Sequence, residues 1–392
     1  MKPFSLDRSS ILLFVIIAFV AGALIFLGIS LRSDEVDEAV KVDRILNVLV
    51  IVELEGKPAA AELFLFYPST GKGAILDVPA ETGLIIKSLN RVDRIDALYD
   101  PRRPKAYVEE VARVLSAAVP YYLILDAKGL AGTVDLLEGL ELFIAQPIES
   151  SGPPPVRLPS GALVVDGDKA VQFASYRGEE EAEGEAPARR QKLTQALFRR
   201  LGQKASWLAE PTVFPVFQRA LRTNLSTDAL RRFAQELGRL DADRLVQQRI
   251  TGVYREVDGK RLLFPHYDGE LVRDIVKQTL NALSNSGGAD VADKIFTVEI
   301  LNGTPSKGLA KRTAEIFQSF GYDVVSVGNA DREDYASTVV LDRFANAEAA
   351  GNVADVIRCR NVSPGGGQGD AAAVADFTVI LGNDFNGRYC AN

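Results

Sequence analysis

Arginine residues are the side chains in this 392-residue chain whose types and spacing best suit chemistry on a charged ligand. Arg177 follows the segment Ala170–Tyr176, which we expect to be a strand, and Arg189, Arg190 and Gln191 open a predicted helix soon after it. Two guanidinium groups brought together across such a loop form a phosphate clamp, because each offers a planar fork of donors. The pattern alone also fits solvated surface arginines that bind nothing.

Other kinds of reactive site lack the necessary residues. The chain has two cysteines and one histidine, fewer than the four or so ligands of a structural zinc site. His266, in the turn-like segment Phe264–Gly269, is interpreted as a surface or loop residue rather than a catalytic base. Gly303–Leu309 begins like a phosphate-binding loop, but the Lys and Ser or Thr after the second glycine are absent. The net charge of −7 predicts no nucleic-acid partner.

Residues Ile11–Leu31 contain no charged side chain and predict a transmembrane anchor. As a helix they reach about 30 Å, the thickness of the hydrocarbon core of a bilayer. Lys2 and Arg8 precede the segment, so residues 1–10 should form a cytoplasmic tail. Residues 32–45 are then a juxtamembrane segment, and the bulk of this single-pass protein of the inner or cytoplasmic membrane lies in the extracytoplasmic or periplasmic space. The alternative is a cleaved signal peptide.

Cys359 and Cys390 lie outside the membrane in this interpretation, where oxidation is permitted. A disulfide between them would close a loop of about 30 residues and stabilise the fold by roughly 3–4 kcal/mol in the chain-entropy model. The alternative is a pair of unpaired thiols.

Short apolar runs alternate with helical periodicity over residues 46–284, which predicts a layered α-β-α domain. The predicted strands are residues 47–53, 62–67, 73–78 and 121–125, with a turn at 68–71. The predicted helices are residues 104–117, 128–137, 188–201, 227–237 and 269–283, with Ser226 and Asp268 as N-caps of the last two. Consecutive prolines predict a loop over residues 150–161.

The segment 285–294 is predicted to be a linker, and residues 295–392 a small α/β domain. Strands are expected at residues 297–301, 323–327, 338–341 and 377–381, and helices at 307–320 and 345–357. Gly321 is a suitable C-cap for the first of these helices.

Three segments carry a resemblance to a known family. Val119–Ile144, Val164–Arg177 and Ala188–Leu201 resemble the LytR-CpsA-Psr family, and Phe296–Phe385 resembles the LytR C-terminal domain that often follows it. The resemblance implies an envelope protein that transfers glycopolymers from a polyprenyl-pyrophosphate carrier to peptidoglycan. In that chemistry arginines neutralise the diphosphate, acidic residues hold Mg²⁺, and an apolar cavity takes the lipid.

The site residues that the resemblance implies are only partly present. Lys57-Pro58-Ala59 replaces Arg-x-Asp, Pro79-Ala80-Glu81 replaces Pro-Arg-Asp, and Ser175-Tyr176-Arg177 keeps one arginine of Arg-x-Arg. Arg190-Gln191 matches the final Arg-Gln, and Arg94 opens Arg-Ile-Asp-Ala where the family has Lys-Ile-Asn-Ala. The ligand-binding candidates are therefore Lys57, Arg94, Arg177, Arg190 and Gln191. The catalytic candidates are Arg177, Arg190 and Glu81, and Glu81 is also the metal candidate.

Two main hypotheses follow. In the first, which we prefer, the chain is a non-catalytic relative that binds a polyprenyl-linked glycan carrier, peptidoglycan or an envelope protein, because the missing groups are those that neutralise phosphate charge. Losing one such donor costs roughly 10²–10³ in rate. In the second, it is an active Mg²⁺-dependent phosphotransferase whose rearranged site uses Lys57, Glu62, Glu81, Arg177 and Arg190. A purely structural spacer is a third, less specific interpretation.

Overall fold

The computed structural model describes residues 35–150, 156–176, 185–284, 296–344, 346–364 and 375–391. The predicted anchor at residues 11–31, the linker at 285–294 and Arg177 lie outside these ranges. Of the helices within them, none is both long enough and apolar enough to cross a membrane. Membrane anchorage therefore stays a prediction.

The first domain is built on a six-stranded mixed sheet with the order β11-β6-β1-β2-β3-β12. Its strands are β1 (Leu46–Leu54), β2 (Lys57–Tyr67), β3 (Lys72–Asp77), β6 (Tyr121–Asp126), β11 (Arg222–Thr223) and β12 (Val246–Arg249). Strands β1, β2 and β3 are antiparallel neighbours, and β2 and β3 form a hairpin around the predicted turn at residues 68–71. Strands β6 and β12 run parallel to β1 and β3, respectively.

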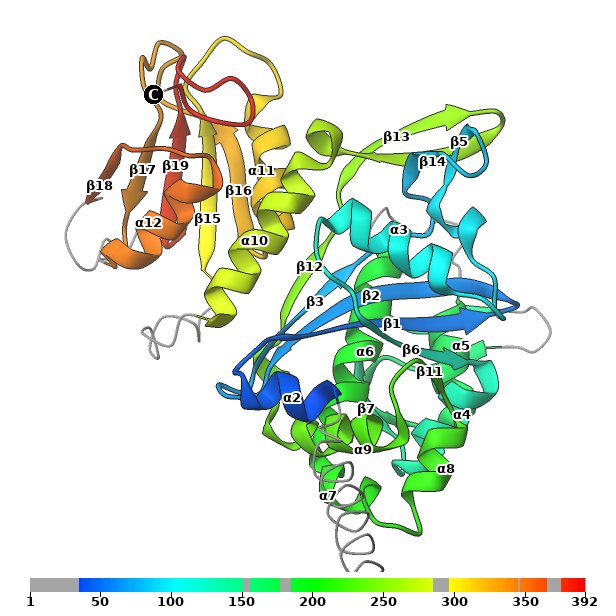
Figure 1. Ribbon diagram of the computed structural model, residues 1–392. Helices are drawn as coiled ribbons and strands as arrows, with labels where there is room; N and C mark the ends of the chain where they lie inside the picture. Colours follow the sequence, from blue (N-terminus) through cyan, green and yellow to red (C-terminus); the bar gives the residue numbers. More distant parts are fainter. Residues whose placement is uncertain are drawn as a thin grey trace, which may run out of the picture.

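Helices cover both faces of this sheet, so the domain has the predicted α-β-α layers (Figure 1). Alternate residues of β2 point to opposite faces, with Leu63 and Leu65 in one core and Phe64 and Phe66 in the other. The first face packs against α3 (Lys105–Leu115) and α10 (Glu270–Ser284). The second packs against α4 (Ala127–Leu136), α5 (Gly167–Ser175), α6 (Glu185–Gln203) and α9 (Thr227–Glu236).

Smaller elements surround the three layers. The short helices are α2 (Glu35–Lys41), α7 (Ala205–Leu208) and α8 (Phe214–Arg219), and the 3₁₀ turns are η1 (Ile95–Leu98), η2 (Leu237–Arg239), η3 (Ala242–Arg244) and η4 (His266–Gly269). The two-stranded sheets are β4 (Gly83–Ile86) with β5 (Arg91–Arg94), β7 (Leu140–Ile144) with β10 (Gly161–Val165), β8 (Ile148–Ser150) with β9 (Val156–Leu158), and β13 (Gly252–Val257) with β14 (Lys260–Pro265).

Three local predictions were wrong. The segment 170–176 is not a strand but most of helix α5, because Asp166 caps its N-terminus and its apolar residues are buried at helical spacing. Part of the predicted loop at 150–161 pairs as β8 and β9. Asp268 is not an N-cap, since it lies inside η4 with φ of 52°. Ser226, by contrast, caps α9 by accepting a hydrogen bond from the Ala229 amide, as predicted.

The second domain is a five-stranded sheet, order β16-β15-β19-β17-β18, with two helices packed on it (Figure 1). Its elements are β15 (Thr297–Asn302), α11 (Leu309–Ser319), β16 (Asp323–Asn329), β17 (Val339–Asp342), α12 (Ala347–Val356), β18 (Val362–Pro364) and β19 (Phe377–Leu381). Gly321, with φ of 86°, follows the end of α11 as expected for a C-cap glycine.

Helix α10 belongs to the first domain and also packs against the second (Figure 1). Leu271 and Ile275 of α10 share one apolar core with Phe317 and Phe320, which lie at the end of α11. His266, in turn η4 just before α10, is half-buried with Nε2 3.7 Å from Glu315 of α11, and burial lowers its pKa. The two domains are therefore joined by a packed interface.

Candidate functional site

The site candidates from the strands gather at one end of the six-stranded sheet. Strand β2 begins at this end with Lys57, and β3, which is antiparallel to it, ends here at Asp77. Glu81 follows β3 by four residues. The register places Glu62 of β2 directly opposite Asp77, so both carboxyl groups lie on the face that packs against α6.

Arg190 reaches this end of the sheet from α6, and its charge is balanced there by Asp77. Its Nη2 lies 3.6 Å from Oδ1 of Asp77, and both side chains are buried. Burial raises the pKa of Asp77, although Arg190 and Arg249 act in the opposite direction. The arginine that best matches the resemblance is thus already paired with a carboxylate of the same chain.

Glu62 is the second buried carboxyl beside Arg190. Burial, together with the neighbouring charge of Asp77, raises the pKa of Glu62 to about 8, while Thr194 and Arg190 act to lower it. Neither carboxylate oxygen has a hydrogen-bond partner of normal geometry among the described residues. Glu62 is therefore mostly protonated at neutral pH, and Arg190 lies beside two buried carboxyl groups whose pKa values are both raised by burial.

The residues next to Arg190 have structural contacts of their own. Arg189 donates from Nε to the carbonyl of Phe173 (3.1 Å) and from Nη2 to the carbonyl of Tyr176 (2.8 Å). These contacts cap the C-terminal end of α5. Gln191 donates to the backbone carbonyl of Gln248 on β12. The side chains of Arg189 and Gln191 are thus both engaged by backbone carbonyl groups.

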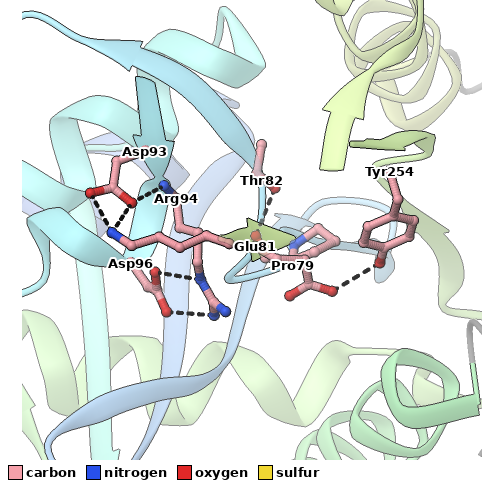
Figure 2. A network of polar contacts seen from close by, with 8 residues as sticks. Pro79, Glu81, Thr82, Asp93, Arg94, Asp96 and Tyr254 are labelled. Carbon is pink, nitrogen blue, oxygen red and sulfur yellow. Dashed lines mark hydrogen bonds and ion pairs between the residues drawn. The ribbon is translucent and has the colours of Figure 1, made fainter. Parts of the chain in front are cut away.

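Glu81 and Arg94 lie in a second polar network, shown in Figure 2. The hydroxyl of Tyr254, on β13, donates to Oε1 of Glu81 at 3.0 Å, and the amide of Leu263, on β14, donates to the Glu81 carbonyl at 2.8 Å. Arg94 donates from Nε and Nη2 to the two carboxylate oxygens of Asp96, at 3.0 and 2.7 Å. The β13–β14 hairpin therefore packs directly on the turn that carries Glu81.

The same network fixes the β4–β5 hairpin to β14. Lys260 donates to both oxygens of Asp93, at 2.8 and 3.0 Å. Hydrogen bonding from Lys260, with help from the Arg94 amide and Arg91, lowers the pKa of Asp93 to about 2. Each of these cations has an intramolecular carboxylate partner, as expected for a structural network.

The carboxylates at this end of the sheet do not fit a magnesium site. Mg²⁺ requires near-octahedral oxygen ligands, usually one or two carboxylates with water and substrate phosphate. Asp77 lies beside the guanidinium of Arg190, which would repel a divalent cation, and Glu62 is mostly protonated. In the described parts of the chain, no group of three or more His, Cys, Asp or Glu side chains is placed to hold a metal ion.

Aromatic rings occupy the region between the sheet and helices α6 and α9. Phe64 of β2 stacks on Phe198 of α6 with ring centroids 4.0 Å apart, and it meets Phe233 of α9 edge-on at 6.4 Å. All three side chains are buried. At these positions the apolar face of the sheet is packed by the protein's own side chains.

Sequence reasoning missed Asp77, Tyr254 and a further buried acid, Glu53. Glu53 accepts hydrogen bonds from Tyr99 and Arg222 at 2.5 Å each. A signal was present for Asp77, because it is the one acidic residue in the otherwise apolar strand 73–78. No comparable signal marks Tyr254 in the sequence, since its role depends on the position of the β13–β14 hairpin. Lys57 is exposed at the first residue of β2, away from the buried cluster.

Comparison with known families and structures supports the expected fold. The LytR_cpsA_psr family matches residues 66–294, and the domain described as LytR cell envelope-related transcriptional attenuator matches residues 296–385. No curated protein matches the chain.

Among solved structures, TagV of B. subtilis is 15% identical with a TM-score of 0.54, covering 61% of this chain and 98% of TagV. A transcriptional regulator (EF0465) from Enterococcus faecalis is 14% identical with a TM-score of 0.53, covering 62% and 90%. TagT bound to LI-WTA is 16% identical with a TM-score of 0.51, covering 62% and 91%. At these identities the likeness establishes the fold of the first domain.

Proposed function

This chain belongs to the LytR-CpsA-Psr family, and from that membership we propose that it is a membrane-anchored, extracytoplasmic envelope protein that binds its ligand without transferring it. Its ligand would be a polyprenyl-linked glycan carrier, peptidoglycan or an envelope protein. The solved relative TagT was captured with LI-WTA, which makes a lipid-linked glycan a reasonable first ligand to test.

The observation that carries this proposal is the internal pairing of Arg190 with Asp77. An arginine can stabilise the charge that develops on a transferring phosphoryl group only if its own charge is available to that group. Here the buried carboxyl group of Asp77 lies 3.6 Å from it, and a diphosphate would have to displace that group. Glu81 and Arg94 are similarly engaged, by Tyr254 and Asp96.

The alternative function is an active phosphotransferase with a rearranged site. It is favoured by family membership and by the positions of Glu81 and Arg190, which both lie near Asp77. The poor fit of the carboxylates to Mg²⁺ weighs against it.

A transfer assay separates the two functions. The full chain in nanodiscs is incubated with Mg²⁺, peptidoglycan and a glycopolymer carried on polyprenyl diphosphate. We expect no phosphodiester-linked product on peptidoglycan, whereas product formation above that of a protein-free control would refute the non-catalytic proposal.

A binding titration then identifies the ligand class. Farnesyl diphosphate with Mg²⁺ is titrated into wild type, Arg177→Ala and the exposed control Arg102→Ala. If the ligand binds to wild type and to Arg102→Ala but more weakly to Arg177→Ala, the result supports a polyprenyl diphosphate carrier as the ligand. Equal and negligible binding in all three removes the carrier and leaves peptidoglycan, tested by co-sedimentation, or a protein partner.

A further inference from the structure

Residues 385–391 form a loop that joins the two domains, which we call the docking loop. Its backbone is held as a tight hairpin by pairing of Phe385 with Cys390. From it, the buried Arg388 donates from Nη2 to Asp274 of α10 at 2.8 Å and from Nη1 to the carbonyl of Val356 at 2.7 Å. One side chain of the second domain thus bonds to α10 in the first domain and to the end of α12 in its own.

Neighbouring residues strengthen the same contact. The Tyr389 hydroxyl donates to Asp274, and its ring lies 4.2 Å below the Arg388 guanidinium. The Tyr267 hydroxyl, from η4 of the first domain, donates to the carbonyl of Gly387 at 2.5 Å. The docking loop is therefore a main polar connection between α10 and the second domain.

Cys390 lies in the docking loop, next to Cys359 just beyond α12. The Cys390 amide donates to the carbonyl of Ile357 at 3.0 Å, which brings Cys390 beside the segment that carries Cys359. Both side chains are buried, and both are free thiols in the structure. The backbone bond from Cys390, the bond from Arg388 to Val356 and the Arg358 guanidinium, 3.7 Å from the Tyr389 ring, hold the end of the loop against α12 and the residues just after it.

We propose that Cys359 and Cys390 form a disulfide that fixes the docking loop against α12, so that oxidation of this pair holds the two domains in their docked arrangement. The proposal does not depend on the proposed function, because it concerns only how the domains are held together. It extends the expected pairing of the two cysteines to a role at the domain interface.

The chemistry is a thiol–disulfide exchange with an external disulfide as oxidant. Hydrogen bonding from Cys390 lowers the pKa of Cys359 to about 7, so Cys359 supplies the attacking thiolate. It attacks one sulfur of the oxidant and releases one thiolate. Cys390 then loses its proton and attacks Sγ of Cys359, which releases the second thiolate. Two protein thiols are oxidised, and the oxidant disulfide is reduced to two thiols.

The experiment uses the wild-type full chain in nanodiscs in two redox states. One sample is equilibrated with oxidised glutathione and the other with a reductant, and both are then alkylated and mapped by mass spectrometry. We expect a linked peptide pair containing Cys359 and Cys390 in the oxidised sample only. Recovery of both cysteines in alkylated form after oxidation would refute the disulfide.

Hydrogen exchange tests the effect on docking. In the oxidised sample we expect amide exchange at residues 386–391 and 270–275 to slow by about tenfold or more relative to the reduced sample, while β1 and β2 remain unchanged. The variant Cys390→Ser should exchange like the reduced sample under both conditions. A linked pair without slower exchange at 270–275 would refute the role at the interface.

Discussion

Glu62, Asp77 and Arg190 form a cluster of ionisable side chains in the interior of the first domain. Placing an ionised pair in the interior is costly, and the pair persists because removing either partner leaves an uncompensated charge. Glu62 avoids that cost by remaining protonated, since its pKa is raised to about 8. An arginine held in this way contributes to the structure of the domain.

The raised pKa of Glu62 predicts a pH-dependent stability. Relative to its ordinary pKa of 4.5, Glu62 binds its proton more tightly in the folded state. Its contribution is therefore fully present below pH 4.5 and is lost as the pH rises towards about 8. We expect the free energy of unfolding to fall by a few kcal/mol over this window, because one pKa unit corresponds to about 1.4 kcal/mol.

Urea denaturation of wild type and Glu62→Gln at pH 5, 7 and 9 measures this effect. The variant should lose the part of the slope that Glu62 causes, so that its stability relative to wild type improves between pH 5 and pH 9. Glu141→Gln, at an exposed position on β7, should follow the wild-type curve. Parallel curves for wild type and Glu62→Gln would contradict the assigned protonation state.

For single residues, the sequence indicated which side chains to consider as site candidates but not which groups they contact. Arg190, Gln191, Glu81 and Arg94 were identified from their motif positions, but which group each contacts depends on the sheet register and on α6. The clamp expected across the loop between Arg177 and the pair Arg189 and Arg190 is untested, but within that pair Arg189 caps α5 and Arg190 lies beside Asp77. Arg177 lies outside the described residues and remains a prediction.

At the scale of helices and strands, long and strongly patterned segments were predicted correctly. Strands β1, β2, β3 and β6 are near-continuous apolar runs bounded by turn residues, and α3, α6 and α9 bury one face at helical spacing. The segment 170–176 was assigned to the wrong class because a short apolar run fits both periodicities. In the structure Asp166 caps the N-terminus of this segment, which favours the helix over a strand.

The short hairpins were missed for a different reason. Strands β5 and β13 are rich in charged residues, and β13 buries no side chain fully, so neither shows the alternation of a half-buried strand. They are held by tertiary contacts such as Lys260 with Asp93 and Tyr254 with Glu81. Contacts between distant segments of this kind leave no local pattern in the sequence.

The β13–β14 hairpin should loosen when its contact with Glu81 is removed. Tyr254→Phe deletes one hydroxyl whose oxygen lies 3.0 Å from Glu81, at an expected cost of about 1 kcal/mol. Chemical denaturation measures the cost, and hydrogen exchange should show faster exchange of the Leu263 amide. Tyr121→Phe, on β6, is a control outside the hairpin. Unchanged exchange at Leu263 would mean that the hairpin is held without Tyr254.

Across the whole molecule, one apolar core extends from the first face of the six-stranded sheet through α10 into the second domain. The composition change near residue 285 suggested two separate units joined by a linker. The composition shows where one domain ends and the next begins. It contains no information on how the surfaces of the two domains pack against each other. Residues on α10 serve both domains, which local patterning could not indicate.

This shared core predicts cooperative unfolding that depends on Arg388. Under reducing conditions Arg388→Ala should separate one thermal transition into two, because Asp274 loses its buried partner and the docking loop loses its bond to Val356. We expect a loss of roughly 2–4 kcal/mol at the interface, below the range for fully buried pairs because Asp274 is partly exposed.

Differential scanning calorimetry checks the number of transitions. Arg332→Ala removes an exposed arginine of the same domain, whose partner Asp334 is also exposed, and should leave a single transition. A single transition for Arg388→Ala as well would show that apolar packing alone joins the domains.

The position of α10 has a consequence for how this protein can vary and be dissected. A helix with two apolar neighbours tolerates a substitution only if both accept it, so mutations in one domain should be compensated in the other. Removing the second domain would expose apolar side chains of α10, such as Leu271 and Ile275, which share a core with Phe317. The remaining first domain would then carry an exposed apolar patch that favours aggregation. A change in ligand binding measured on such a truncated protein could then result from self-association as well as from loss of a binding site.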